Sequence, residues 1–167
     1  QFAADVLETP IDNISVYGVD TDISPYDSGS YASSTTYLTG MAAVKACEQL
    51  RERIIALAAV RMNKDASALT FDGENVIDES DGAKMSLFDI ATASMCNNEI
   101  SLEVTYSHSS PVSPPPFMAA CAEIEADPET GAIELLDYTA CVDCGTVVNT
   151  NLARVQTEGG LLQGIGM

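Results

Sequence analysis

The clearest chemical signal in the sequence is a polar, glycine-containing loop that runs into a helix. The segment Asp27–Tyr37 reads DSGSYASSTTY and places several hydroxyls where the N–H groups of a helix start lack partners. Such a start can bind a phosphate or another anion. The same hydroxyls could instead only cap the helix and one another, and composition alone slightly favours that alternative. No Gly-Lys-Ser/Thr follows, which excludes a Walker-type nucleotide loop.

A second polar segment, NTNLARVQTEGG, covers Asn149–Gly160. Gln156 and Gln163 are seven residues apart and therefore share nearly the same helical face. Gly159 and Gly160 remove side chains from that face, although each glycine costs a helix about 1 kcal/mol relative to alanine. This cost indicates close approach by a ligand or by another backbone. Tight packing of the helix on a strand would explain the glycines equally well.

The other candidate groups give weaker signals. His108 is the only histidine, so neither a nucleophile–histidine–acid set nor a zinc site can be assembled convincingly. Asp20, Asp22 and Asp27 lack the glycine and distal glutamate of a calcium loop, which favours a solvated acidic loop. The short Cys141–Cys144 spacing is a lone pair, and structural thiols are the favoured interpretation.

Composition and charge limit the class of protein. A chain of 167 residues, 46% hydrophobic, fits one ordered domain or two small lobes. The net charge of −18 argues against partners such as nucleic acid and anionic membranes. No apolar run approaches the roughly 18 residues of a membrane-spanning helix, and the N-terminus has no secretory signal. Five scattered cysteines suit a reducing compartment, so we expect a cytoplasmic protein.

Helical and strand patterns surround the two polar segments and predict an α+β fold with mixed sheets packed against helices. Asp72-Gly73 and Asp127–Gly131 predict hairpin turns, and Asn149 or Asn151 is expected to cap the last helix. A proline-stiffened connection near residues 108–116 suggests lobes 1–110 and 111–167. Helices are expected over 2–7, 33–62, 86–96 and from 152, and strands over 14–19, 69–71, 75–77, 102–106, 117–126 and 132–142.

Taken in order, these motifs resemble a known family. SGSYASSTTYLTGMAAVKAC and PPFMAACAEIEADPETGAIELLDYTACVDCGTVVNTNLARVQTEGGLLQGIGM together are similar to the large, molybdopterin-binding subunit of xanthine dehydrogenases, aldehyde oxidases and their bacterial relatives. The similarity covers nearly the whole chain, and VQTEGGLLQGIG is its most specific part. The resemblance implies that residues 1–167 belong to one molybdenum cofactor-binding domain, truncated at both ends.

The resemblance also implies roles for five residues. Ala32 would lie beside molybdenum without ligating it, so no direct metal ligand is expected. Ser33, Ser34 and Thr35 would hydrogen-bond the cofactor, and Gln156 would donate to it near the metal. No catalytic residue is expected in this chain, because the family's general-base glutamate belongs to a Gly-Glu-Pro-Pro-type motif that the sequence does not contain.

The implied activity belongs to an assembled enzyme. The resemblance implies oxidative hydroxylation of purines, N-heterocycles or aldehydes at a molybdopterin centre, with the cytosine dinucleotide form as one option. Iron–sulfur (2Fe-2S) and FAD groups would lie on partner domains or subunits of an oligomer, and the isolated chain would be inactive. A non-catalytic scaffold or assembly domain is the alternative, because Thr150 and Val155 stand where the family usually has proline and glycine.

Overall fold

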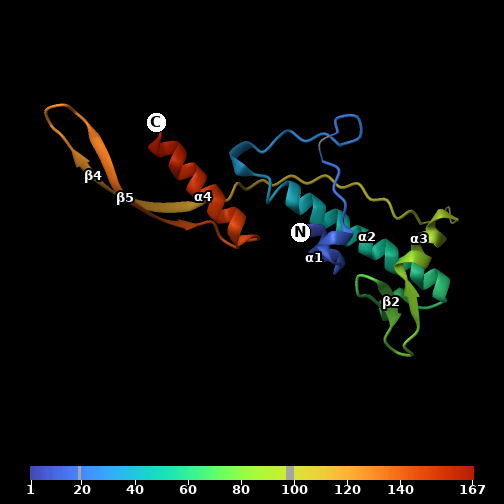
Figure 1. Ribbon diagram of the computed structural model, residues 1–167. Helices are drawn as coiled ribbons and strands as arrows, with labels where there is room; N and C mark the ends of the chain where they lie inside the picture. The colour runs from blue at the N-terminus through green and yellow to red at the C-terminus, as the bar shows by residue number, and fades with distance from the viewer. Residues whose placement is uncertain (19, 97–99) are drawn as a thin grey trace. The chain divides into compact units, whose positions relative to one another are not determined.

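The computed structural model describes residues 1–18, 20–96 and 100–167 and divides the chain into two compact units. The first unit is Gln1–Pro111 and the second is Val112–Met167, so the division falls in the proline-rich connection. Each unit combines helix with antiparallel sheet, which confirms the α+β class (Figure 1). No helix in the described ranges is both long and apolar enough to cross a membrane.

A long helix, α2 (Thr39–Met62), organises the first unit. The elements around it are α1 (Phe2–Leu7), β1 (Leu69–Phe71), β2 (Asn75–Asp78), β3 (Lys84–Ser86) and α3 (Leu87–Met95). The three strands form an antiparallel sheet in the order β1-β2-β3. One face of α2 packs with this sheet and α3 around a single core, made of Ile54, Leu57, Ala58, Ala59, Leu69, Phe71, Val76 and Ile90.

Local sequence accounts for the ends of these elements. The hydroxyl of Ser86 accepts a hydrogen bond from the backbone N–H of Asp89 and so caps α3. Asn63 ends α2 in the left-handed conformation, as asparagine does readily. The predicted turn between β1 and β2 is confirmed: Gly73 has a φ of +91°, and the Asp72 carboxylate accepts from two N–H groups of the turn.

The second unit is a long hairpin followed by a helix. Strands β4 (Phe117–Ala126) and β5 (Ile133–Asp143) pair antiparallel, and α4 (Thr150–Ile165) comes after them. A β-bulge lies between Glu123, which pairs with Asp137, and Ile124, which pairs with Leu135. Leu136 is therefore the extra residue of β5.

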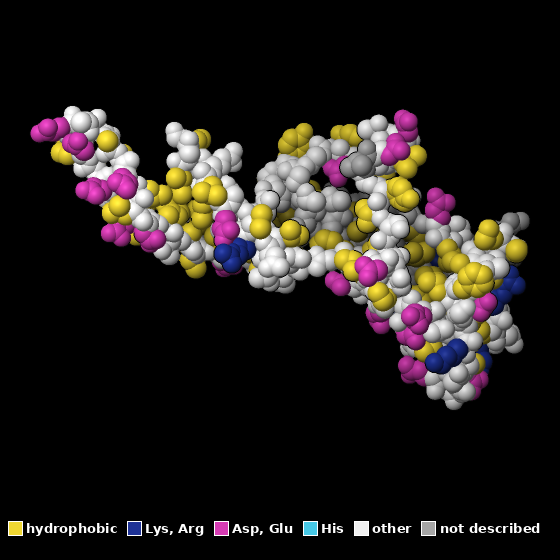
Figure 2. Space-filling view, in the orientation of Figure 1, with side chains coloured by type: hydrophobic (Ala, Val, Ile, Leu, Met, Phe, Trp, Pro, Cys, Tyr) yellow, Lys and Arg dark blue, Asp and Glu magenta, His cyan; other side chains and the backbone are white. Residues whose placement is uncertain are grey.

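The second unit buries very little of its own surface. The structure describes every residue of 112–167, and none of them is buried. An apolar groove runs between the hairpin and α4, and Figure 2 shows hydrophobic side chains gathered there. The groove is lined by Met118, Ala122, Ile124, Ile133, Leu135, Tyr138, Gly160, Leu161, Gly164 and Ile165.

Three sequence predictions were wrong in detail. Residues 14–18 form no strand, and Val19, the end of that predicted strand, lies outside the described residues. Residues 102–106 form no strand either, because the guanidinium of Arg53 instead takes up the carbonyls of Ser101 and Glu103. Helix α2 begins at Thr39 rather than residue 33, because the backbone preceding it is left-handed.

Candidate functional site

The loop that precedes α2 has an unusual backbone. Ala32 has φ 51° and ψ 33°, and Ser33 has φ 58°, so two consecutive non-glycine residues are left-handed. Ser34 then returns to the right-handed region at φ −84° and ψ −3°. Left-handed conformations are uncommon for residues with a Cβ and cost free energy, so the surrounding contacts must impose this one. We call residues Asp27–Thr39 the donor loop.

This backbone gathers a group of N–H donors on one side of the loop. A left-handed residue followed by a right-handed one turns successive N–H groups toward one side and forms a concave nest for an anion. The N–H groups of Ser33 and Ser34 close the 3-10 turn Tyr31–Ser33, and the N–H of Thr35 follows them directly. Ser34 is only 4% exposed, so part of this nest is shielded from water. The arrangement can accept a phosphate or another oxyanion.

The hydroxyls of the donor loop play two roles. The Thr35 hydroxyl donates to Ser30 Oγ at 2.5 Å, so this pair does bind within the loop, as the capping alternative requires. Leu38, at the cap position of α2, makes no side-chain capping bond. At the helix start, the backbone carbonyls of Ser34 and Thr35 accept from the N–H groups of Leu38 and Gly40.

The donor loop carries no cationic side chain. The first lysine or arginine of the sequence is Lys45, and none lies between Gln1 and Val44. An anion held by this loop would therefore rest on neutral N–H and hydroxyl donors rather than on an ion pair. Neutral N–H and hydroxyl groups can also donate to uncharged acceptor atoms of a ligand, besides a phosphate.

Helix α4 presents the second predicted segment. Asn149 caps it by accepting from the N–H of Leu152, which confirms one of the two expected caps. Gln156 is exposed, and Gly159, Gly160 and Gln163 follow it at positions that share its helical face. A Cβ at Gly159 or Gly160 would meet no atom within 4 Å. Packing inside the second unit thus does not explain these two glycines, and the space beside them is open to a ligand or to another part of a larger protein.

The five predicted site residues belong to two units. Ala32, Ser33, Ser34 and Thr35 are consecutive in the donor loop of the first unit, and Gln156 lies on α4 of the second. In the first unit, the four consecutive residues lie in the polar loop that precedes α2. In the second unit, Gln156 lies within α4 itself.

Among the described residues, His108 and the cysteines add no candidate metal or catalytic group. His108 is half-buried, and all five cysteines are free thiols. No group of three His, Cys, Asp or Glu side chains suited to a metal ion occurs in residues 1–18, 20–96 and 100–167. Arg154 pairs with Glu158 at 2.6 Å one turn along α4, an exposed pair of the kind that supports a helix.

Sequence reasoning located the donor loop and missed what its backbone does. Neither alanine nor serine signals a positive φ, and Gly29 is the only glycine in this loop. The groove beside α4 was missed as well, because its residues come from the hairpin and from α4 and meet only in the folded unit.

The comparison with known proteins decides the family. A model of the molybdopterin cofactor-binding domain matches residues 1–167. The chain belongs to this family. Its relatives include the protein named probable hypoxanthine oxidase from Escherichia coli K12, which is 35% identical over 167 residues, 99% of this chain and 17% of that protein. The xanthine dehydrogenase molybdenum-binding subunit of Escherichia coli O157:H7 is 29% identical over 171 residues, 99% of this chain and 23% of that protein.

Two solved structures share the fold of this chain. Quinoline 2-oxidoreductase from Pseudomonas putida 86 matches with a TM-score of 0.74 and 26% identity, over 99% of this chain and 22% of that chain. The Cu,Mo-CO dehydrogenase matches in fold with a TM-score of 0.78 and 24% identity, over 96% of this chain and 21% of that chain. The chain thus spans about a fifth of the length of the proteins it matches.

The donor loop suits the group that gives the family its name. A molybdopterin carries a phosphate and a heterocycle rich in polar atoms, and the nest of Ser33–Thr35 offers several neutral donors to such a ligand. The open space beside Gly159 and Gly160 would also admit a bulky group next to Gln156. The residues present therefore fit a molybdopterin.

Proposed function

We propose that this chain is the cofactor-binding part of a molybdenum hydroxylase, which oxidatively hydroxylates purines, N-heterocycles or aldehydes. The observation that carries the proposal is the left-handed backbone of the nest at Ser33–Thr35 in a member of the molybdopterin cofactor-binding family. The similarity to a xanthine dehydrogenase subunit and to quinoline 2-oxidoreductase supports purines and N-heterocycles among these classes.

In this proposal each site residue has a limited task. Ala32 is exposed and ends in a methyl group, so it leaves room beside molybdenum without ligating it. Ser33, Ser34 and Thr35 donate hydrogen bonds through N–H and hydroxyl groups, and the carboxamide of Gln156 donates near the metal. The bound cofactor supplies the redox chemistry. The described residues hold and orient it, and the general base lies on another part of the enzyme.

The larger assembly is part of the same proposal. Electrons would leave through 2Fe-2S and FAD groups on partner domains or subunits, in an oligomeric enzyme of the cytoplasm. The cofactor would be molybdopterin, with the cytosine dinucleotide form as one option. The isolated chain would be inactive, since it spans about a fifth of its relatives.

The alternative is a non-catalytic scaffold domain, suggested by Thr150 and Val155. Thr150 takes the first position of α4, and the Asn149 cap is kept without a proline there. Val155 lies on a continuous helix with 60% of its surface exposed. Since neither residue interrupts the helix that carries Gln156, this observation favours the hydroxylase.

The test is the molybdenum and pterin content of the full-length parent protein, made in a host that synthesises the cofactor. We expect near-stoichiometric metal in the wild type and a sharp loss in Gln156→Ala. The matched control is Gln163→Ala, about two helical turns further along the same face of α4. This variant should lose less molybdenum than Gln156→Ala. A metal-free parent protein from a competent host would reject the hydroxylase and favour the scaffold.

A further inference from the structure

Two polar ties close the donor loop on itself. The outer tie joins residues 12 apart: Oδ2 of Asp27 accepts from the Thr39 hydroxyl at 3.2 Å. The inner tie is the bond between the hydroxyls of Thr35 and Ser30, five residues apart. Asp27 also fixes the start of the loop, because its Oδ1 accepts from the N–H of Gly29 at 2.7 Å. A loop of this length with joined ends is a compact Ω-type loop.

The outer tie has a clear mechanical role. Thr39 is the first residue of α2, a helix anchored in the core, whereas Asp27 lies in an exposed polar segment. Their bond therefore fastens the free end of the loop to the rigid part of the first unit. The left-handed residues Ala32 and Ser33 lie between the two ends, and they persist only where contacts over-determine the backbone.

We infer that Asp27 is a positioning residue for the cofactor nest, acting through Thr39 and Gly29 rather than by contact with the ligand. This inference rests on the proposed function, because it assumes that the nest of Ser33–Thr35 binds the cofactor. Asp27 sets the separation of the loop ends, and that separation keeps the three N–H groups turned to one side. Without the tie, the loop relaxes toward ordinary backbone angles and the donors diverge.

The test compares molybdenum and pterin content across variants of the full-length parent protein, normalised to folded protein by thermal unfolding. Asp27→Ala removes both contacts of the carboxylate, and we expect a loss of cofactor content of about tenfold or more, as for other residues that orient ligand-holding groups. Asp27→Asn keeps an acceptor for Gly29 and a partner for the Thr39 hydroxyl, so it should restore the content. Rescue by the amide distinguishes positioning from a need for charge.

Matched controls come from the same chain. Asp20 accepts from the N–H of Asp22 in a turn like that of Asp27 and Gly29, and it lies outside the donor loop. Asp20→Ala should therefore keep the wild-type content. Thr39→Val removes only the outer tie and should lower the content, whereas Thr39→Ser retains the hydroxyl and should not. The double variant Asp27→Ala/Thr39→Val should lose no more than Asp27→Ala alone, because both changes break the same bond.

The outcomes separate the two proposals. If the wild type holds cofactor and Asp27→Ala holds as much, the positioning role is wrong and the proposed function stands. If the wild type holds none, the proposed function fails first. Should Asp27→Ala not fold, Thr39→Val and Thr39→Ser decide: equal content in these two variants rejects the positioning role, and loss only in the valine variant supports it.

Discussion

The ammonium of Lys64 lies 2.9 Å from Oδ2 of Asp78, a carboxylate of which only 2% is exposed. Asp78 also accepts from the N–H and hydroxyl of Ser80, and Lys64 also pairs with Asp81. These bonds connect the segment after α2 with the end of β2, beside the core of the first unit. The bonds from Ser80 and Lys64 lower the pKa of Asp78 to about 2, and the partners of Lys64 raise its pKa.

This pair predicts a specific pH dependence of stability. Because the folded pKa of Asp78 lies below its ordinary value of 3.8, its contribution is complete above about pH 4 and is lost as the pH falls through about 2. The raised pKa of Lys64 adds a contribution that is complete below 10.5 and is lost as the pH rises through the folded value. Thermal unfolding curves of wild type and Asp78→Asn should therefore converge between pH 4 and 2.

Removing the cation tests the same pair at neutral pH. Lys64→Met leaves the Asp78 carboxylate buried without its counter-ion, so the unfolding temperature should drop by several degrees. Lys45→Met is the control, because Lys45 pairs with Glu48 on an exposed helix surface and should change little. Equal effects of the two substitutions would contradict a structural role for the buried pair.

Gly73 should not tolerate a side chain. A Cβ at this position would lie 2.1 Å from the carbonyl oxygen of Glu8, and the φ of +91° is unfavourable for any other residue. We expect Gly73→Ala to lower the free energy of unfolding by about 3 kcal/mol, from backbone strain plus the clash. Gly82 has a φ of +74° and no neighbour within 4 Å, so Gly82→Ala should cost only about 1 kcal/mol. Urea unfolding of both variants measures the difference, and equal losses would exclude the close approach to Glu8.

A substitution at Gly160 should change helix stability and cofactor content in opposite directions. In the second unit, an added Cβ there meets nothing within 4 Å, so Gly160→Ala should stabilise α4 by about 1 kcal/mol. The same methyl group would enter the space beside Gln156, and cofactor content of the parent protein should decrease. Hydrogen exchange in α4 and metal analysis measure the two effects. Gain of stability with unchanged metal would mean that the cofactor does not approach this glycine.

The chain by itself should self-associate. Unit 2 buries none of its residues, and the groove beside α4 exposes Met118, Ile124 and Ile133. Association should strengthen with salt, since the net charge of −18 opposes it at low ionic strength. Ile124→Lys should weaken it, whereas Val112→Lys, outside the groove, is the control. Light scattering that finds only monomer at high salt would count against the prediction.

The regular parts of the fold could be read from the sequence. The hairpin of β4 and β5 follows from two alternating runs joined at Asp127–Gly131, and α3 from its Ser86 cap. The late start of α2 could not be read, because serine and threonine residues that suit a helix cap instead line a strained loop. Residues 102–106 alternate as a strand does, but Arg53 binds the backbone of this segment where a neighbouring strand would be needed.

The candidate site was predicted in its composition and missed in its geometry. Hydroxyls and a helix start indicated an anion site at the donor loop, and the glycines indicated space beside Gln156. The nest depends on the positive φ angles of Ala32 and Ser33, which lie between the hydrogen-bonded residues Asp27 and Thr39. Such angles leave no trace in residue type, so the nest is visible only in three dimensions.

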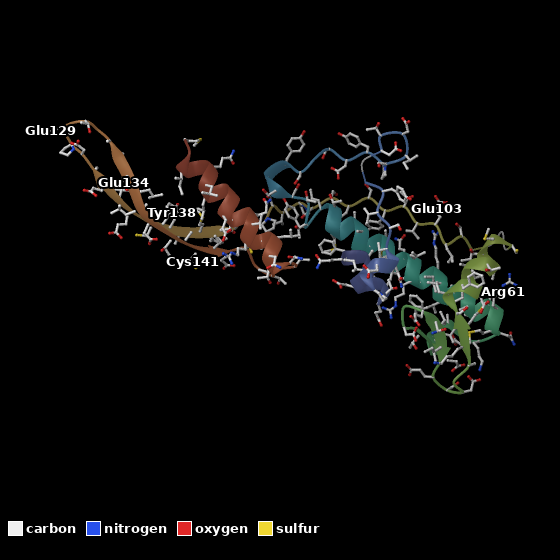
Figure 3. All side chains as sticks on the ribbon, in the orientation of Figure 1. Arg61, Glu103, Glu129, Glu134, Tyr138 and Cys141 are labelled. Atoms are coloured by element: carbon white, nitrogen blue, oxygen red, sulfur yellow. The ribbon has the colours of Figure 1, made fainter. Side chains whose placement is uncertain are left out.

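The β-bulge at Leu136 lets the two halves of β5 keep the same face toward the groove despite the extra residue. Tyr138 and Leu135 are three residues apart and would point to opposite faces of a regular strand, yet both line the groove beside α4. Figure 3 shows Glu134 on the same strand, nearer the tip at Glu129. Deleting Leu136 would leave Leu135 and Tyr138 two residues apart, the spacing at which a regular strand keeps both side chains on one face, so both would still face the groove. A one-residue deletion should therefore be tolerated far better at Leu136 than at Thr139, where Tyr138 would lose its pairing with Ala122 and turn away from the groove.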